Sequence, residues 1–198
     1  MKITKHIHAC VDIDGIVFDP GSFGVPDGLD QAEAILITHG HADHVDAEAI
    51  NGSGLQVFGP ADLAGQLTNL RPVADGEVLE LAGHTIEVVA SPHEEIITSR
   101  ELPDNLAYVI DGRVIHCGDS FPPVPNMELA LVATSAPWLR MKMLEDYLRT
   151  TTPKAFAGIH DGLDNHKGLG IRGTICEELA RDFGIEYHAL SPDESLTI

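Results

Sequence analysis

Short apolar runs separated by polar turns recur along the chain and predict a β-rich fold. Strands are expected in the N-terminal half at residues 7–13, 15–18, 34–37, 55–58, 78–81 and 85–90. Strands are expected in the C-terminal half at residues 106–110, 113–117, 129–133, 155–159 and 185–190. Runs of this length are typical of buried strands. Asp14-Gly15 and Asp111-Gly112 are dipeptides that favour tight hairpin turns between neighbouring strands.

Stretches with helical spacing lie between these strands. Helices are expected at residues 47–50, 60–70, 138–149 and 172–183. Leu139, Met143 and Tyr147 recur at intervals that place them on one helix face. Pro60 suits the first turn of a helix, where its missing N–H costs nothing. Helices interspersed with strands predict an α/β fold.

Composition limits the size of the protein and the partners that it can bind. A chain of 198 residues with 43% apolar residues has enough material for one well-packed core, so a single domain over residues 1–198 is expected. The chain holds 12 Lys and Arg against 31 Asp and Glu, a net charge of −19. Such a surface repels nucleic acid and anionic membranes, so neither is an expected partner.

Cysteine usage and the N-terminal residues predict a cytoplasmic protein. The three cysteines are widely spaced, and an odd number gives no disulfide framework. The first residues lack the apolar core of a signal peptide, and no apolar run is long enough to cross a membrane. A reducing compartment is therefore expected.

A cluster of histidines and aspartates follows the apolar run at residues 34–37. His39, His41, Asp43 and His44 form the pattern H-x-H-x-D-H. Imidazole and carboxylate groups are the ligands that borderline divalent metals prefer. In α/β proteins, the loops at the carboxyl ends of strands are where sites are built. The cluster therefore predicts a metal site at a sheet edge.

This motif resembles the signature of the metallo-β-lactamase superfamily. His8-Ala9-Cys10, the turn Asp19-Pro20-Gly21 and the short chain are most similar to the ascorbate-6-phosphate lactonase-like branch of small metal-dependent hydrolases. The resemblance implies an α/β protein with a four-layer αβ/βα sandwich and one or two metals at the edge of the sheets. It also implies three later ligands, each at a strand end, and His93, Asp119 and His160 have the right order and spacing.

The resemblance also implies a role for each ligand. His39, His41 and His93 would hold one metal, while Asp43, His44 and His160 would hold the other. Asp119 would lie between the two ions, and Asp43 and Asp119 are the candidate catalytic carboxylates. The mixed ligands suit zinc, with two ions expected, although manganese or iron would also fit.

Four further residues are candidates for the surroundings of the metals. The resemblance implies that Asp19 supports the metal loop from behind without being a ligand. Trp138 would border the pocket or belong to the core, and Asp161 would support a ligand or begin a turn. His166 would meet an anionic substrate or lie in a solvated loop. His8 lies in a predicted strand and is expected to be an ordinary strand residue.

These features predict a metal-dependent hydrolase that opens a lactone, ester or related bond in a small polar molecule. Three alternatives stay open: a phosphodiesterase or nuclease of the same superfamily, a mononuclear iron oxygenase, and a metal-binding protein with no turnover. The sequence names neither the substrate nor the metal, and it is compatible with a homo-oligomer.

Overall fold

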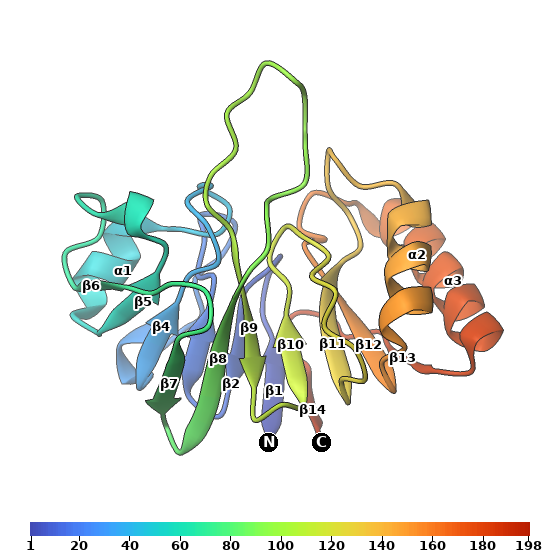
Figure 1. Cartoon of the computed structure of the whole chain (residues 1–198), viewed down its shortest axis with the longest axis horizontal. Coiled ribbons are helices and arrows are strands. Elements are labelled where there is room, and N and C mark those ends of the chain that lie inside the picture. Colours follow the sequence, from blue (N-terminus) through green and yellow to red (C-terminus); the bar gives the residue numbers. More distant parts are fainter.

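Two seven-stranded sheets form the centre of the protein in a computed structural model that describes residues 1–198 (Figure 1). The first sheet has the order β14 (Ser195–Thr197), β1 (Lys2–Lys5), β2 (Val11–Ile13), β3 (Ile16–Phe18), β4 (Ala34–Leu36), β5 (Val57–Gly59) and β6 (Leu70–Pro72). The second has the order β13 (Glu186–His188), β12 (Ala155–Ile159), β11 (Leu129–Ala133), β10 (Val114–His116), β9 (Leu106–Ile110), β8 (His84–Ala90) and β7 (Val78–Leu81).

Helices cover the outer faces of the sheets. Helix α1 (Ala47–Ser53) packs on the first sheet, and α2 (Met141–Thr151) and α3 (His166–Phe183) pack side by side on the second (Figure 1). Two short 3₁₀ turns, at Leu29–Gln31 and Ala61–Leu63, complete the helical elements. The predicted αβ/βα sandwich is confirmed.

Three apolar clusters fill the spaces between these four layers. The largest contains 22 buried residues and lies between the sheets. A cluster of 13 lies under α2 and α3, and a cluster of 10 lies under α1. In β12, Ala157 faces the central cluster and Phe156 faces the helices. Both faces of such strands are buried, which explains why they are continuous apolar runs in the sequence.

Strand direction brings the candidate loops to one edge of the sandwich. Strands β3 to β6 are parallel in the first sheet, as are β10 to β13 in the second. Strand β8 runs in the direction of β10, because both are antiparallel to β9. The carboxyl ends of β3, β4, β8, β10 and β12 lead directly into the loops that carry the predicted site residues.

The predicted helix at residues 60–70 is wrong. Only the turn Ala61–Leu63 is helical, and the chain then enters β6 at Leu70. Leu63 and Leu67 are buried as a helical pattern requires, but Gly65 between them has φ +96°. That left-handed conformation cannot continue a helix, so the apolar spacing is satisfied by consecutive turns instead.

Several other boundaries differ from the prediction, and the differences are largest at two of them. The strand expected at residues 7–13 covers only Val11–Ile13, and residues 6–10 form a loop. Helix α3 begins at His166 instead of Arg172, because the Asn165 side chain accepts hydrogen bonds from the Lys167 and Gly168 N–H groups and caps the helix. None of the helices has the length and apolar character needed to span a membrane.

Candidate metal centre

The loop that follows β4 is held in place from both sides. Asp46 caps α1 by accepting a hydrogen bond from the Ala49 N–H group. Gly21 lies against the loop so closely that a Cβ atom at this position would lie 1.8 Å from the Asp43 carbonyl oxygen. Any side chain larger than glycine would therefore push the loop away, and the Asp19-Pro20-Gly21 turn sets the loop's position.

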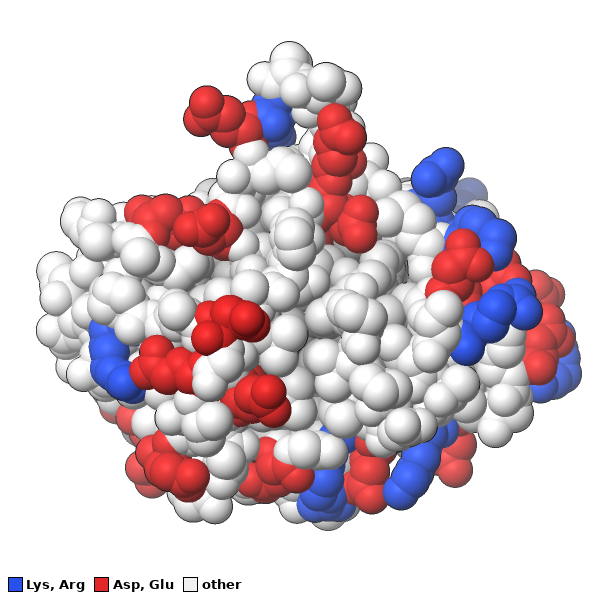
Figure 2. All heavy atoms as spheres, in the orientation of Figure 1, with Lys and Arg blue, Asp and Glu red and all other residues white.

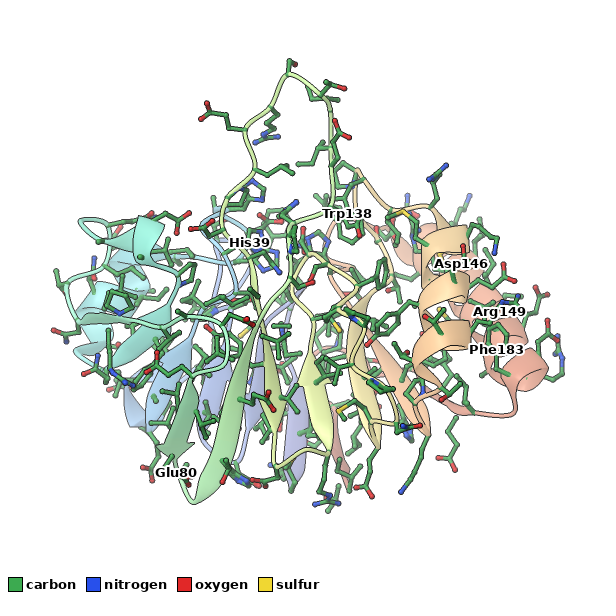
Figure 3. The ribbon with its side chains drawn as sticks, in the orientation of Figure 1. His39, Glu80, Trp138, Asp146, Arg149 and Phe183 are labelled. Carbon is green, nitrogen blue, oxygen red and sulfur yellow. The ribbon has the colours of Figure 1, made fainter.

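Eight side chains from five loops converge at this edge in two groups. In each group the potential ligand atoms lie within 4.8 Å of one another. The first group contains His39, His41, His93 and Asp119, and the second contains His8, Asp43, His44 and His160. The structure thus brings together all seven residues predicted as ligands and adds His8. Figure 3 shows His39 above the sheets, with Trp138 nearby.

Asp119 lies between the two groups. Its Oδ2 atom is 3.4 Å from His93 Nε2 and 3.2 Å from His160 Nε2, and its Oδ1 atom is 3.3 Å from His44 Nε2. The Trp138 indole N–H donates a hydrogen bond of 2.9 Å to Oδ2. One carboxylate therefore contacts histidines of both groups, as a bridging ligand would.

Four buried polar atoms at the centre of this cluster have no hydrogen-bond partner. They are Nε2 of His44, His93 and His160 and Oδ1 of Asp119. Burying such an atom without a partner costs about 1–3 kcal/mol. All four are metal-ligating atoms and face one another, so a cation between them would satisfy the whole set. The residues present fit a metal.

In His93 and His160, the hydrogen bond made by Nδ1 determines which ring nitrogen carries the proton. His93 Nδ1 lies 2.6 Å from the Glu94 carbonyl oxygen, and His160 Nδ1 contacts the Ser135 carbonyl oxygen. A carbonyl oxygen only accepts hydrogen bonds, so Nδ1 is the donor in both rings. The lone pair of each Nε2 atom then faces the cluster, which is the tautomer that binds metal.

Asp19 supports two of the candidate ligands from behind. It is fully buried and accepts hydrogen bonds of 2.7 Å from the Thr38 N–H and hydroxyl groups. His44 Nδ1 lies 2.8 Å from Asp19 Oδ2. Because the Thr38 hydroxyl donates to Asp19, it is free to accept from His39 Nδ1 at 3.0 Å. Asp19 therefore orients His44 directly and His39 through Thr38.

The histidines around Asp119 keep its carboxylate ionised. Burial alone would raise the pKa of Asp119, but His44 and His160 hold it well below its ordinary value. Burial opposes a charge on His160, but the neighbouring Asp119 and Asp43 carboxylates raise its pKa to about 9. Without a bound cation, therefore, protonated histidine takes up the positive charge that the carboxylates attract.

Three residues at the site adopt left-handed backbone conformations, as do six non-glycine residues elsewhere in the chain. His8, Asp19 and His160 have φ values of 63°, 47° and 62°, in the left-handed region that non-glycine residues avoid. Each such residue costs of order 1–3 kcal/mol, which the surrounding structure has to offset. The surrounding hydrogen bonds hold all three in these conformations.

A pocket of about 310 Å³ opens over the cluster. It is lined by Ser22, Phe23, His41, Ala42, Asp43, Ile96, Arg100, Asp119, Pro137, Trp138 and His160. Ile96 and Arg100 belong to the loop between β8 and β9, which rises above the sheet edge in Figure 1. Figure 2 shows that this raised loop carries both acidic and basic side chains. The pocket has room for a small molecule.

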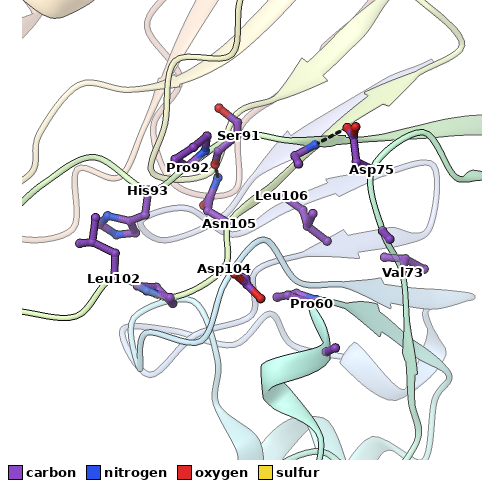
Figure 4. Close-up of a pocket in the computed structure, with 14 residues that line it drawn as sticks. Pro60, Val73, Asp75, Ser91, Pro92, His93, Leu102, Asp104, Asn105 and Leu106 are labelled. Atoms are coloured by element: carbon purple, nitrogen blue, oxygen red, sulfur yellow. Dashed lines mark hydrogen bonds between the residues drawn. The ribbon is translucent and has the colours of Figure 1, made fainter.

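A second cavity, of about 400 Å³, is lined in part by His93 (Figure 4). Its wall is mainly apolar, with Pro60, Val73 and Leu106, and two of its polar groups are already engaged. Asp75 accepts the Ala90 N–H group, and the Asn105 amide donates to the Ser91 carbonyl oxygen. Of the candidate metal ligands, only His93 lines this cavity, whereas His41, Asp43, Asp119 and His160 line the first pocket. The first pocket is therefore the better candidate for a substrate site.

A family model described as a β-lactamase superfamily domain matches residues 2–134. The chain belongs to the metallo-β-lactamase superfamily. It is 28% identical over 203 residues to the protein Rv0786c of Mycobacterium tuberculosis, covering 93% of this chain and 96% of that one. It is 33% identical over 137 residues to a UPF0173 metal-dependent hydrolase of Thermoplasma volcanium. That match spans 61% of each protein, less than two thirds of the relative's length.

Solved structures share the fold at low sequence identity. Igni18, a metallo hydrolase from Ignicoccus hospitalis, has a TM-score of 0.72 at 19% identity, covering 100% of this chain and 97% of its own. YhfI from Bacillus subtilis, a metallo-β-lactamase fold protein, has a TM-score of 0.71 at 17% identity and 98% coverage of both chains. CmlA, a diiron β-hydroxylase from Streptomyces venezuelae, has a TM-score of 0.67 at 15% identity, covering all of this chain and 54% of its own.

The structure places the three predicted pocket residues of this superfamily member differently with respect to the candidate metal centre. Trp138 lines the pocket and contacts Asp119. Asp161 instead forms an ion pair of 3.0 Å with the buried Lys5. His166 is exposed at the start of α3 and does not line the pocket, so the structure gives no support for contact with substrate.

His8 is the site residue that sequence reasoning missed. The expectation of an ordinary strand position was wrong, because residues 6–10 form a loop and the side chain is buried beside Asp43. The one available signal was its place in His8-Ala9-Cys10, a part of the family resemblance. Its apolar neighbours suggested a strand, and only long-range contacts reveal its position.

Proposed function

We propose that this chain is a hydrolase that binds two zinc ions and opens a lactone, ester or related bond in a small polar substrate. The observation that carries the proposal is the set of four buried, unpartnered ligand atoms at the centre of two converging His/Asp groups. The names of relatives, among them the metal-dependent hydrolase of Thermoplasma volcanium, support the reaction class.

Each group supplies ligands for one ion. His39, His41 and His93 would hold one, and Asp43, His44 and His160 the other, with Asp119 shared. When bound, zinc ions supply a water nucleophile near neutral pH and polarise the bond to be cleaved. Mixed imidazole and carboxylate ligands suit zinc, and manganese or iron would also fit the site.

Side chains around the ligands position the reacting groups. Trp138 holds Asp119 through the indole N–H group, and Asp19 holds His44. Trp138 and Phe23 also give the pocket flat apolar walls that can exclude water from the bond to be cleaved.

Arg100 narrows the class of substrate. It is the only Lys or Arg lining the pocket, and its side chain forms neither a hydrogen bond nor an ion pair. An unpaired guanidinium on an otherwise acidic protein attracts an anionic group. The substrate is therefore a small molecule that carries a carboxylate or phosphate.

Hydrolysis of a small phosphodiester is the second candidate, and the same arginine favours it. Nucleic acid is a poor fit, because the net charge of −19 opposes binding of a polyanion. A mononuclear iron oxygenase fits less well, because the structure has two groups of four ligand residues instead of one. The cytoplasmic location, the single-domain organisation and any homo-oligomer stay predictions.

Elemental analysis and a substrate panel on the same zinc-loaded sample test the proposal. We expect two zinc ions per chain and turnover of an anionic lactone or ester, with slower cleavage of a phosphodiester chromophore. Chelation should abolish turnover, and zinc should restore it. Asp146→Asn, an exposed change on α2, is the matched control and should leave the zinc content and the turnover unchanged. Undiminished turnover by metal-free protein would refute the proposal.

A further inference from the structure

His8 lies inside the second group of candidate ligands but makes different contacts from the other histidines. Its side chain is buried in the loop between β1 and β2. Its ring centroid lies 3.9 Å from that of His160 and 4.7 Å from that of Phe23. By position alone His8 would be counted as a metal ligand with Asp43, His44 and His160.

Both ring nitrogens of His8 already have a hydrogen-bond partner. The Gly162 backbone N–H group lies 3.0 Å from Nδ1, and Asp43 Oδ2 lies 3.0 Å from Nε2. A backbone N–H group only donates, so Nδ1 is the acceptor and carries no proton. The proton of the neutral ring is then on Nε2, where it is donated to Asp43.

This arrangement leaves no lone pair of His8 for a cation. The Nδ1 lone pair accepts from Gly162, and Nε2 carries the proton. His44 and His160 differ, because their Nε2 atoms are buried without any partner. Hydrogen-bond geometry therefore separates His8 from the ligands that surround it.

The backbone of His8 strengthens the same connection. Its carbonyl oxygen accepts a hydrogen bond of 2.9 Å from the His160 N–H group. Through its main chain and its ring, His8 links the loop after β12 to the metal loop that carries Asp43. Its left-handed backbone, with φ 63°, allows both contacts at once.

We infer that His8 is a positioning residue that holds the Asp43 carboxylate against the second metal site and does not ligate the ion itself. The inference rests on the proposed two-metal function. Partners of this kind orient a ligating carboxylate, and their loss typically lowers metal affinity by about 10–100-fold.

Cadmium-113 replacement tests the inference without measuring activity. In the protein loaded with two cadmium-113 ions, proton–cadmium correlation spectra detect scalar coupling from the ring protons of ligating histidines. We expect correlations from His39, His41, His44, His93 and His160, and none from His8. Coupling from His8 overturns the inference and leaves the two-metal proposal intact. A protein that binds no cadmium or zinc overturns both.

Zinc titration of variants gives a second readout. His8→Leu should lower the affinity for the second zinc ion by about 10–100-fold and leave the affinity for the first unchanged. His8→Gln keeps an N–H donor near Asp43 and should restore most of that affinity. His6→Gln is the matched control, because His6 pairs with Asp193 at the surface. Equal losses in His8→Leu and His8→Gln, with normal folding by circular dichroism, contradict a positioning role.

Discussion

Histidines lie among aspartates at both ends of the sandwich, and the two ends differ in how those side chains are satisfied. At the end away from the pocket, His84 Nδ1 lies 2.7 Å from Asp111 and Nε2 lies 3.2 Å from Asp14. Each ring nitrogen there has a partner, and the groups are partly exposed. At the end with the candidate metal centre, three Nε2 atoms are buried without any partner.

The far cluster has a structural explanation that needs no ligand. Asp14 lies in the β2–β3 turn of the first sheet, whereas His84 begins β8 and Asp111 lies in the β9–β10 turn of the second. Their contacts connect the two sheets. Histidines and aspartates whose polar atoms are all paired connect two sheets. The same residue types indicate a binding site where buried polar atoms are left unpaired.

The largest expected effect is at Asp119, the carboxylate that lies between the two groups of candidate ligands. Asp119→Asn should lower activity by more than about 100-fold, the upper loss for a residue that merely supports a ligand. Steady-state kinetics with elemental analysis would check this, with Asp111→Asn at the far cluster as the control. Similar kinetics in the two variants would remove the distinction between the ends.

Metal removal should destabilise the protein, because the unpaired atoms lose their ion. Zinc at 100 times its dissociation constant contributes about 2.7 kcal/mol per site to the folded state. For a chain of this size, that raises Tm by about 5–10 °C. Differential scanning calorimetry with and without chelator measures the shift. An unchanged Tm would mean that the unpaired atoms bind nothing.

Trp138→Phe should have an intermediate effect. The change keeps an aromatic wall but removes the N–H group that orients Asp119, so activity should fall by about 10-fold with zinc still bound. Kinetics and elemental analysis on one preparation separate the two effects. Loss of zinc from this variant would show instead that the indole is needed for metal retention.

The smallest effect is expected at the far cluster. His84→Gln should lower the free energy of unfolding by less than about 1 kcal/mol, because partly exposed ion pairs contribute little. Urea denaturation measures this change, and zinc affinity should not move. A variant that lost zinc would show that the two ends of the sandwich are coupled.

Local patterns in the sequence account for much of the fold and for the position of the candidate site. The apolar runs that predicted strands, such as Ala155–Ile159, are buried on both faces, so packing reinforced the local preference. The H-x-H-x-D-H motif follows β4 directly, and strands that run in the same direction bring His93, Asp119 and His160 to the same edge. Their ligation of metal stays a prediction.

Tertiary structure decided what local patterns could not. The helix expected at residues 60–70 gave way to turns, because the backbone at Gly65 adopts a left-handed conformation. The C-terminal strand Ser195–Thr197 forms only by pairing with Lys2–Lys5 at the other end of the chain. Neither outcome is encoded in apolar spacing.

The sequence by itself determined the superfamily and the sandwich through the resemblance carried by a compact motif, and short-range periodicity located most of the strands. The roles of individual side chains were decided only by folding. His8 bonds Gly162, 154 residues away, and Lys5 pairs with Asp161, 156 residues away. A hydrogen bond across such a separation depends on how two sheets meet, which no local pattern contains.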